Sequence, residues 1–135
     1  MLEIPGAPAD VGPDWVNAAL GDHDHFQGSR VSGVSSEVIG DGAGFQAQVV
    51  RLHLSYERSG QTGPATVVLK LPSTEPRVRQ MAVSHGIYGR EVGLYRDLAF
   101  RGGVPAPACY WCAIDPGPER FGILLPDLGE LASED

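Results

Sequence analysis

Three glycines occupy alternate positions in the segment VIGDGAGFQAQVVRL, residues 38–52. Gly40, Gly42 and Gly44 lie between stretches of strand-forming residues. Glycine loses more backbone freedom on folding than any other residue, so three at this spacing need a structural reason. One interpretation is a tight hairpin without a ligand. The other is a loop whose backbone closely approaches an anion, and phosphate is the usual candidate.

Two charged residues lie in segments that are otherwise apolar. Lys70 lies within the strand-like stretch VVLKL. Glu91 shares a predicted helix face with Ile87, Leu94 and Leu98. Burying either charge is costly without a partner, so we expect an ion pair between Lys70 and Glu91 across a strand and a helix. From these two residues alone, a binding site and a purely structural salt bridge remain open as alternatives.

The elements that position these residues follow from the hydrophobic period. Apolar residues alternate over 46–56, which predicts a half-buried strand, and the period then changes to about 3.6 over 75–101, which predicts a helix. The fold class is therefore α+β: a five-stranded antiparallel sheet packed on one long helix, with a short N-terminal helix. The expected order is a helix from Pro13 to Gly21, strands 30–39, 46–56 and 66–72, the long helix, and strands 110–114 and 121–125.

A glycine loop, a strand with an inward lysine and a helix with an inward glutamate follow the order in which a protein kinase holds ATP. The segments IGDGAGFQAQVVRL, TVVLKLP, YGREVGLYRDLA, GVPAPACYW and GILLPDL resemble the N-terminal lobe of the aminoglycoside phosphotransferase and ecdysteroid-kinase-like superfamily. This family has a protein-kinase-like fold and phosphorylates hydroxyls of small molecules. The resemblance divides the chain into a lead with a short helix (1–29), an ATP-binding lobe (30–125) and a hinge that begins a second lobe (126–135).

The resemblance implies that the chain binds ATP. The three glycines would cover the phosphates, Lys70 would contact them, and Glu91 would orient Lys70. Val68 would pack on the adenine, while main-chain groups of the hinge would bond its edge. The residues implied in nucleotide binding are Gly40, Gly42, Gly44, Val68, Lys70, Glu91, Leu125, Asp127 and Leu128.

Two positions depart from the family pattern. Phe45 stands where the last glycine of a GxGxxG motif would be, so the contact with phosphate differs from that in protein kinases. Pro126 stands where the family usually has an acidic residue. Because proline lacks an N–H, this position can bond the adenine only through its carbonyl.

Phosphoryl transfer needs a carboxylate beside the acceptor hydroxyl and acidic or amide ligands for Mg²⁺. The resemblance places these groups in the second lobe, so Mg²⁺ is expected only with that lobe. No catalytic residue and no metal site are expected in this chain, and the acceptor stays unspecified. The alternative hypothesis is a stand-alone, non-catalytic module that binds a partner, or forms a homodimer, through the surface that a second lobe would cover.

The composition excludes other classes of function. A formal net charge of -7, with ten Lys and Arg in total, argues against nucleic acid as a partner. The sequence has neither an apolar run that would indicate a membrane span nor a leader pattern that would indicate export. We therefore expect a cytoplasmic protein with no membrane partner. Cys109 and Cys112 form a CxxC within a predicted strand, where neither thiol is at a helix N-terminus. A redox role is therefore the least favoured of the three hypotheses.

Overall fold

The computed structural model describes the chain in six stretches, with the backbone alone over 95–101: residues 2–20, 30–41, 47–57, 64–101, 110–115 and 120–127. The helices are a short 3-10 helix η1 (Pro8–Asp10), α1 (Pro13–Leu20), α2 (Pro76–Ser84) and α3 (Ile87–Arg101). The strands are β1 (Val31–Gly40), β2 (Ala47–Tyr56), β3 (Thr66–Pro72), β4 (Trp111–Asp115) and β5 (Arg120–Pro126). Each strand begins and ends within one residue of its predicted bounds.

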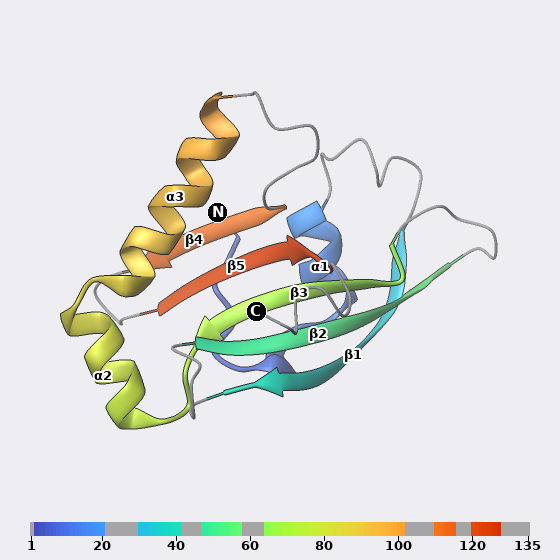
Figure 1. The fold of residues 1–135 in the computed structure, drawn as a ribbon. Coiled ribbons are helices and arrows are strands. Elements are labelled where there is room, and N and C mark those ends of the chain that lie inside the picture. Colours follow the sequence, from blue (N-terminus) through green and yellow to red (C-terminus); the bar gives the residue numbers. More distant parts are fainter. Residues whose placement is uncertain are drawn as a thin grey trace.

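The five strands form one antiparallel sheet in the order β1-β2-β3-β5-β4 (Figure 1). The α+β class and the five-stranded antiparallel sheet are thus confirmed. The last strand of the chain, β5, lies inside the sheet, between β3 and β4. Helices α2 and α3 lie on the left of Figure 1, where α3 runs beside β4 and α2 continues from its lower end.

One face of the sheet packs against α1, and we call it the α1 face. Side chains on this face alternate along β2 and β3 as the period of two predicts. Asn17 of α1 fastens the helix to the edge strand, because its side-chain amide donates to the Val31 carbonyl and accepts from the Val31 N–H, both at 2.9 Å. The core on this face contains Val16, Leu20, Val50, Leu52, Leu54, Val67, Leu69, Leu71 and Leu124.

The opposite face packs against α2 and α3, and we call it the α3 face. Tyr88 of α3 stacks on Phe121 of β5, with ring centroids 4.2 Å apart and the rings inclined by 14°. Val92 lies one turn further along α3 and is buried in the same cluster, together with Ile123. This contact docks α3 on β5, directly beside β3.

The prediction of a single long helix over 75–101 is wrong. The segment forms two helices, α2 and α3, separated at His85 and Gly86. Gly86 has φ of +67°, a left-handed conformation that glycine adopts without steric cost. The Gly86 N–H donates to the Val83 carbonyl at the end of α2, and the Gly86 carbonyl accepts from the Arg90 N–H at the start of α3. Gly86 therefore ends one helix and begins the next.

The predicted inward face of the second helix is also partly wrong. The Leu94 side chain is 56% exposed, although the periodicity placed it with Glu91 on the side facing the sheet. Among the α3 side chains that the structure describes, residues 87–94, Tyr88 and Val92 are buried, and the periodicity placed both beside that face. The stacking of Tyr88 on Phe121 and the burial of Val92 beside Ile123 turn this side of α3 toward the sheet.

Substitutions at two glycines of this region are expected to change stability in opposite directions. An Ala at Gly86 meets no atom within 4 Å, but the left-handed backbone costs about 1 kcal/mol for a residue with a Cβ. An Ala at Gly93, in the exposed interior of α3 and also without neighbours, should stabilise by up to about 1 kcal/mol. Urea unfolding of both variants measures the two signs, and equal signs would contradict the assigned helix break.

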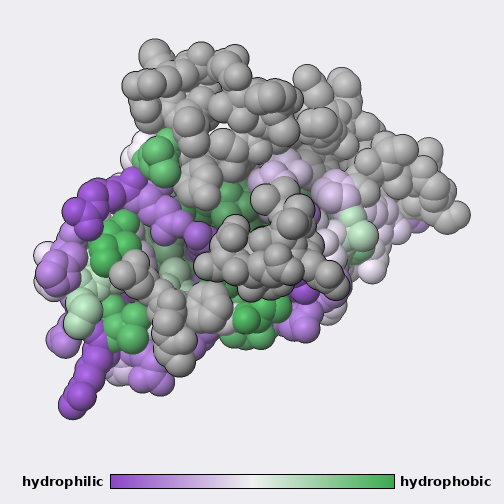
Figure 2. Space-filling view, viewed as in Figure 1, coloured by the Kyte–Doolittle hydropathy of each residue, from purple (hydrophilic) through white to green (hydrophobic). Residues whose placement is uncertain are grey.

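The surface around α2 and α3 is chemically mixed. Figure 2 shows apolar residues interspersed with hydrophilic ones on the left of the view, where these helices lie. Met81 of α2 and Leu94 of α3 are large apolar side chains that are more than half exposed. Within the described stretches, no helix has both the length and the apolar character needed to cross a membrane.

Candidate functional site

Lys70 and Glu91 form the ion pair that the sequence predicts. Lys70 Nζ donates to Glu91 Oε1 at 2.6 Å, the short distance expected for a charge-assisted hydrogen bond. Lys70 lies on the α3 face because its neighbours Leu69 and Leu71 point to the opposite face. Its side chain is 28% exposed and that of Glu91 is 24% exposed, so the pair is in contact with solvent.

The sheet register places Gly40 in the same row as this lysine. Gly40 pairs with Val49, Val49 pairs with Lys70, and Lys70 pairs with Ile123. Strands are about 4.8 Å apart, so the Gly40 backbone lies about 10 Å from that of Lys70. A bulge in β1 between Val38 and Gly40 bends the chain at this point. The first glycine of the segment and the lysine thus lie on neighbouring parts of one surface.

The next row on the α3 face is apolar at its centre. Arg51 pairs with Val68, and Val68 pairs with Leu125. Val68 is 7% exposed and Leu125 is partly buried against the cluster under α3. Cross-strand partners point to the same face, so these two apolar side chains adjoin Lys70.

Asp127, predicted as a hinge residue, is bound to the sheet through its side chain. Its carboxylate is 5% exposed and accepts from Arg51 Nε at 2.7 Å and from Thr66 Oγ1 at 2.8 Å. The hydrogen bond and charge of Asp127 raise the pKa of Arg51, and the charge of Glu37 adds to this. Asp127, the residue that follows β5, is thereby fixed to β2 and β3.

Arg51 and Thr66 were not predicted as site residues. The period of two puts both on the face of Lys70, which was the available signal. Their common partner Asp127 is 76 residues beyond Arg51 in sequence, and no local pattern indicates so distant a contact.

Asp41 is a third residue that was not predicted as part of the site. It directly follows Gly40 and lies in the described part of the glycine segment. Its carboxylate accepts from Ser73 Oγ at 2.7 Å, from the Thr74 N–H at 3.2 Å and from the Thr74 hydroxyl. The start of the glycine segment is therefore bonded to the turn between β3 and α2.

Three of the nine predicted residues lie outside the described stretches, namely Gly42, Gly44 and Leu128. The structure brings the other six to the α3 face or its rim. Within the described stretches, no group of three His, Cys, Asp or Glu side chains is arranged to hold a metal ion.

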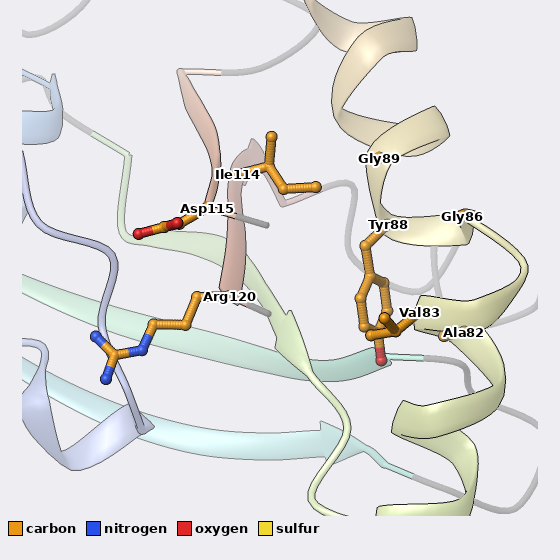
Figure 3. A pocket seen from close by; sticks show the side chains of 8 residues that line it. All are labelled: Ala82, Val83, Gly86, Tyr88, Gly89, Ile114, Asp115 and Arg120. Atoms are coloured by element: carbon orange, nitrogen blue, oxygen red, sulfur yellow. The ribbon is translucent and has the colours of Figure 1, made fainter. Parts of the chain in front are cut away.

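A cavity of about 200 Å³ lies where α2, α3 and the β4–β5 hairpin meet (Figure 3). Figure 3 shows the Ile114 side chain directed toward α3, whereas Asp115 and Arg120 point to the other side of the hairpin. Tyr88 lines this cavity, but neither Lys70 nor Glu91 does. The cavity is thus separate from the ion pair. Its lining residues are Ala82, Val83, Gly86, Tyr88, Gly89, Ile114, Asp115 and Arg120.

No protein-family model, no curated protein and no solved structure matches this chain.

Proposed function

We propose that this chain is the nucleotide-binding lobe of an ATP-dependent phosphotransferase that acts on a small-molecule hydroxyl. The observation that carries the proposal is the Lys70–Glu91 pair at 2.6 Å, in the sheet row that begins at Gly40. A glycine segment, a strand lysine and a helix glutamate are the parts with which kinases bind the phosphates of ATP.

The chemistry of Lys70 fits a phosphate ligand. An ammonium group has three donors, and Glu91 accepts one of them. The two remaining donors can bond phosphate oxygens, since part of the side chain is exposed. Glu91 holds the ammonium group in place before a nucleotide arrives, which reduces the entropy lost on binding.

The use of lysine at this position supports the same role. Lys70 is the only lysine in the sequence, and the other nine basic residues are arginines. An arginine would serve a simple salt bridge equally well, whereas lysine offers a compact, rotatable point charge. In a chain that otherwise uses arginine throughout, lysine at the predicted phosphate contact favours a specific function.

The base of the nucleotide would lie on the apolar row beside the lysine. Val68 and Leu125 provide an apolar surface for the flat face of adenine. The backbone after β5 would bond the base edge, and Asp127 fixes that backbone through Arg51 and Thr66. In this proposal the residues of the chain bind and orient ATP, while the Mg²⁺ ligands and the carboxylate that orients the acceptor belong to a second lobe.

Nucleotide titration of the 135-residue chain tests the proposal. The lobe alone should bind ATP with a Kd of about 1 mM, which corresponds to about -4 kcal/mol, and should bind adenosine more weakly. Amide chemical shifts should change at Gly40, Lys70 and Leu125. Absence of binding at about tenfold higher ATP concentration, or shift changes confined to the α1 face, would refute the proposal.

The single lysine allows a second test. An ATP analogue with an amine-reactive group at its phosphate end has only two amines to react with, Lys70 and the chain's N-terminal amine. Labelling of Lys70 that excess ATP prevents, measured by peptide mass spectrometry, is the expected result. Labelling that ATP does not affect would contradict the assigned site.

A further inference from the structure

An acidic residue inside a phosphate-binding glycine segment is electrostatically unfavourable. A carboxylate close to a triphosphate repels it, and the repulsion grows as water is excluded. Asp41 stands between Gly40 and Gly42, at the start of the segment proposed to contact phosphates. An aspartate at this position must therefore make favourable contacts whose contribution to the free energy outweighs this repulsion.

The structure shows what the Asp41 carboxylate does. Oδ1 accepts from Ser73 Oγ at 2.7 Å and from the Thr74 N–H at 3.2 Å, while Oδ2 accepts from the Thr74 hydroxyl. Such charge-assisted hydrogen bonds are stronger than those between neutral groups. Hydrogen-bond donors of the turn that follows β3 therefore stabilise the negative charge of Asp41.

The contacts continue from this turn to α3. Ser73 is completely buried, and its N–H donates to the Tyr88 hydroxyl at 3.2 Å. Tyr88 is itself 4% exposed and is held by its stacking on Phe121. Glu91 follows Tyr88 by three residues, so the two side chains are neighbours on the helix.

Burial raises the pKa of Tyr88, the hydrogen bond from Ser73 and the charge of Arg79 lower it in part, and the negative charges of Asp41 and Glu91 raise it. Both carboxylates thus act electrostatically on the same phenol. Tyr88 thus accepts the last hydrogen bond of the series that starts at Asp41, and it lies one helical turn before Glu91.

We infer that Asp41, Ser73 and Tyr88 are positioning residues. Their hydrogen bonds hold the start of the glycine segment, at Gly40, in a fixed place relative to α3, the helix that carries Glu91. The phosphate-binding backbone and the Lys70–Glu91 pair are then held in one arrangement. This inference rests on the proposed function. It adds that these residues keep the two proposed phosphate contacts, the Gly40 backbone and Lys70, in a fixed relative position.

A purely structural role for the same bonds makes a different prediction. If Asp41 only stabilised the turn before α2, its loss would lower the free energy of unfolding and leave the preference for ATP over adenosine unchanged. A positioning role changes that preference, because adenosine has no phosphates to contact the glycine segment or Lys70.

The decisive variant is Asp41→Asn in the full chain, with ATP and adenosine affinities measured side by side. Removing a negative charge near a triphosphate would by electrostatics alone strengthen ATP binding. Asparagine keeps Oδ1 as an acceptor for Ser73 and the Thr74 N–H, but it loses the charge that strengthens these bonds and the Oδ2 acceptor for the Thr74 hydroxyl. The weakened positioning bonds should therefore reduce ATP affinity about five- to tenfold, with adenosine affinity unchanged. Unchanged or tighter ATP binding by this variant would overturn the inference.

Glu75→Gln is the matched control. Glu75 lies one residue beyond Thr74, is exposed, and its side chain does not cap α2. The substitution removes the same charge from the same region, and ATP affinity should stay equal or rise slightly. Weakening by this control to the extent seen for Asp41→Asn would also overturn the inference.

Tyr88→Phe tests the other end and keeps the ring that stacks on Phe121. It should weaken ATP binding and not adenosine binding, and the double variant with Asp41→Asn should lose less than the sum of the two effects. Full additivity would argue against one connected network. A wild-type chain that does not bind ATP defeats both proposals, whereas normal ATP binding by both variants defeats only this one.

Discussion

Lys70→Met is expected to weaken ATP binding by about 10- to 100-fold, the effect of losing charge-assisted hydrogen bonds that are worth about 1.5–3 kcal/mol. Methionine keeps the length and the apolar stem of lysine, so the packing on the α3 face should persist. Adenosine binding should be unchanged, because the lost contacts are with phosphates. Titration of the chain with both ligands measures the difference.

Two further variants separate charge from geometry at this site. Lys70→Arg keeps the positive charge but replaces a compact ammonium group with a planar fork. It should satisfy Glu91 and preserve stability, yet bind ATP more weakly than the wild-type chain. Glu91→Gln leaves Lys70 charged but less firmly held, and its loss of ATP affinity should be smaller than that of Lys70→Met. Wild-type affinity in all three variants would remove Lys70 from the binding site.

Phe121→Ala should cause the largest loss of stability, about 3–5 kcal/mol, because it empties a fully buried aromatic site. Phe121 lies on β5, inside the sheet, and its ring is stacked on Tyr88 of α3. The substitution therefore removes both core volume and the main support of α3. The free energy of unfolding in urea, measured by circular dichroism, gives the size of the effect.

Two controls define the cause of that loss. Phe121→Leu retains most of the apolar volume and should destabilise the chain less. Val38→Ala removes apolar atoms from a side chain that is 52% exposed, so it should change stability little. A loss below about 1 kcal/mol for Phe121→Ala would mean that the contact with Tyr88 does not hold α3 on the sheet.

Much of the fold was predictable because strands alternate strictly. The side chains of Val50, Leu52 and Leu54 are buried on the α1 face, as their spacing predicts. The break at Gly86 was not predicted, since Gly89 and Gly93 stand inside α3 and the residue type alone does not show which of the three glycines is left-handed. The packing of α1 on one face of the sheet was not predicted either, because a short helix carries no signal for where it packs.

For the site as well, contacts within a local apolar pattern could be predicted and contacts between distant segments could not. Lys70 and Glu91 could be paired in advance because each is costly to bury alone and each lies in an apolar pattern. The contacts of Asp41 with Ser73 and of Asp127 with Arg51 join residues far apart in sequence. Such contacts depend on the strand order, which local composition does not determine.

The strand order has a consequence for how the chain folds as it is made. The hairpins β1–β2 and β2–β3 can form early, but the free edge of β3 pairs only with β5. Two helices and β4 must be synthesised before β5 is available, so this edge, with Val67 and Leu69 upon it, stays open in the meantime. Closing so long a loop slows folding and leaves an unpaired strand exposed to other chains. The strand that carries Lys70 therefore stays open to pairing with other chains until β5 is complete.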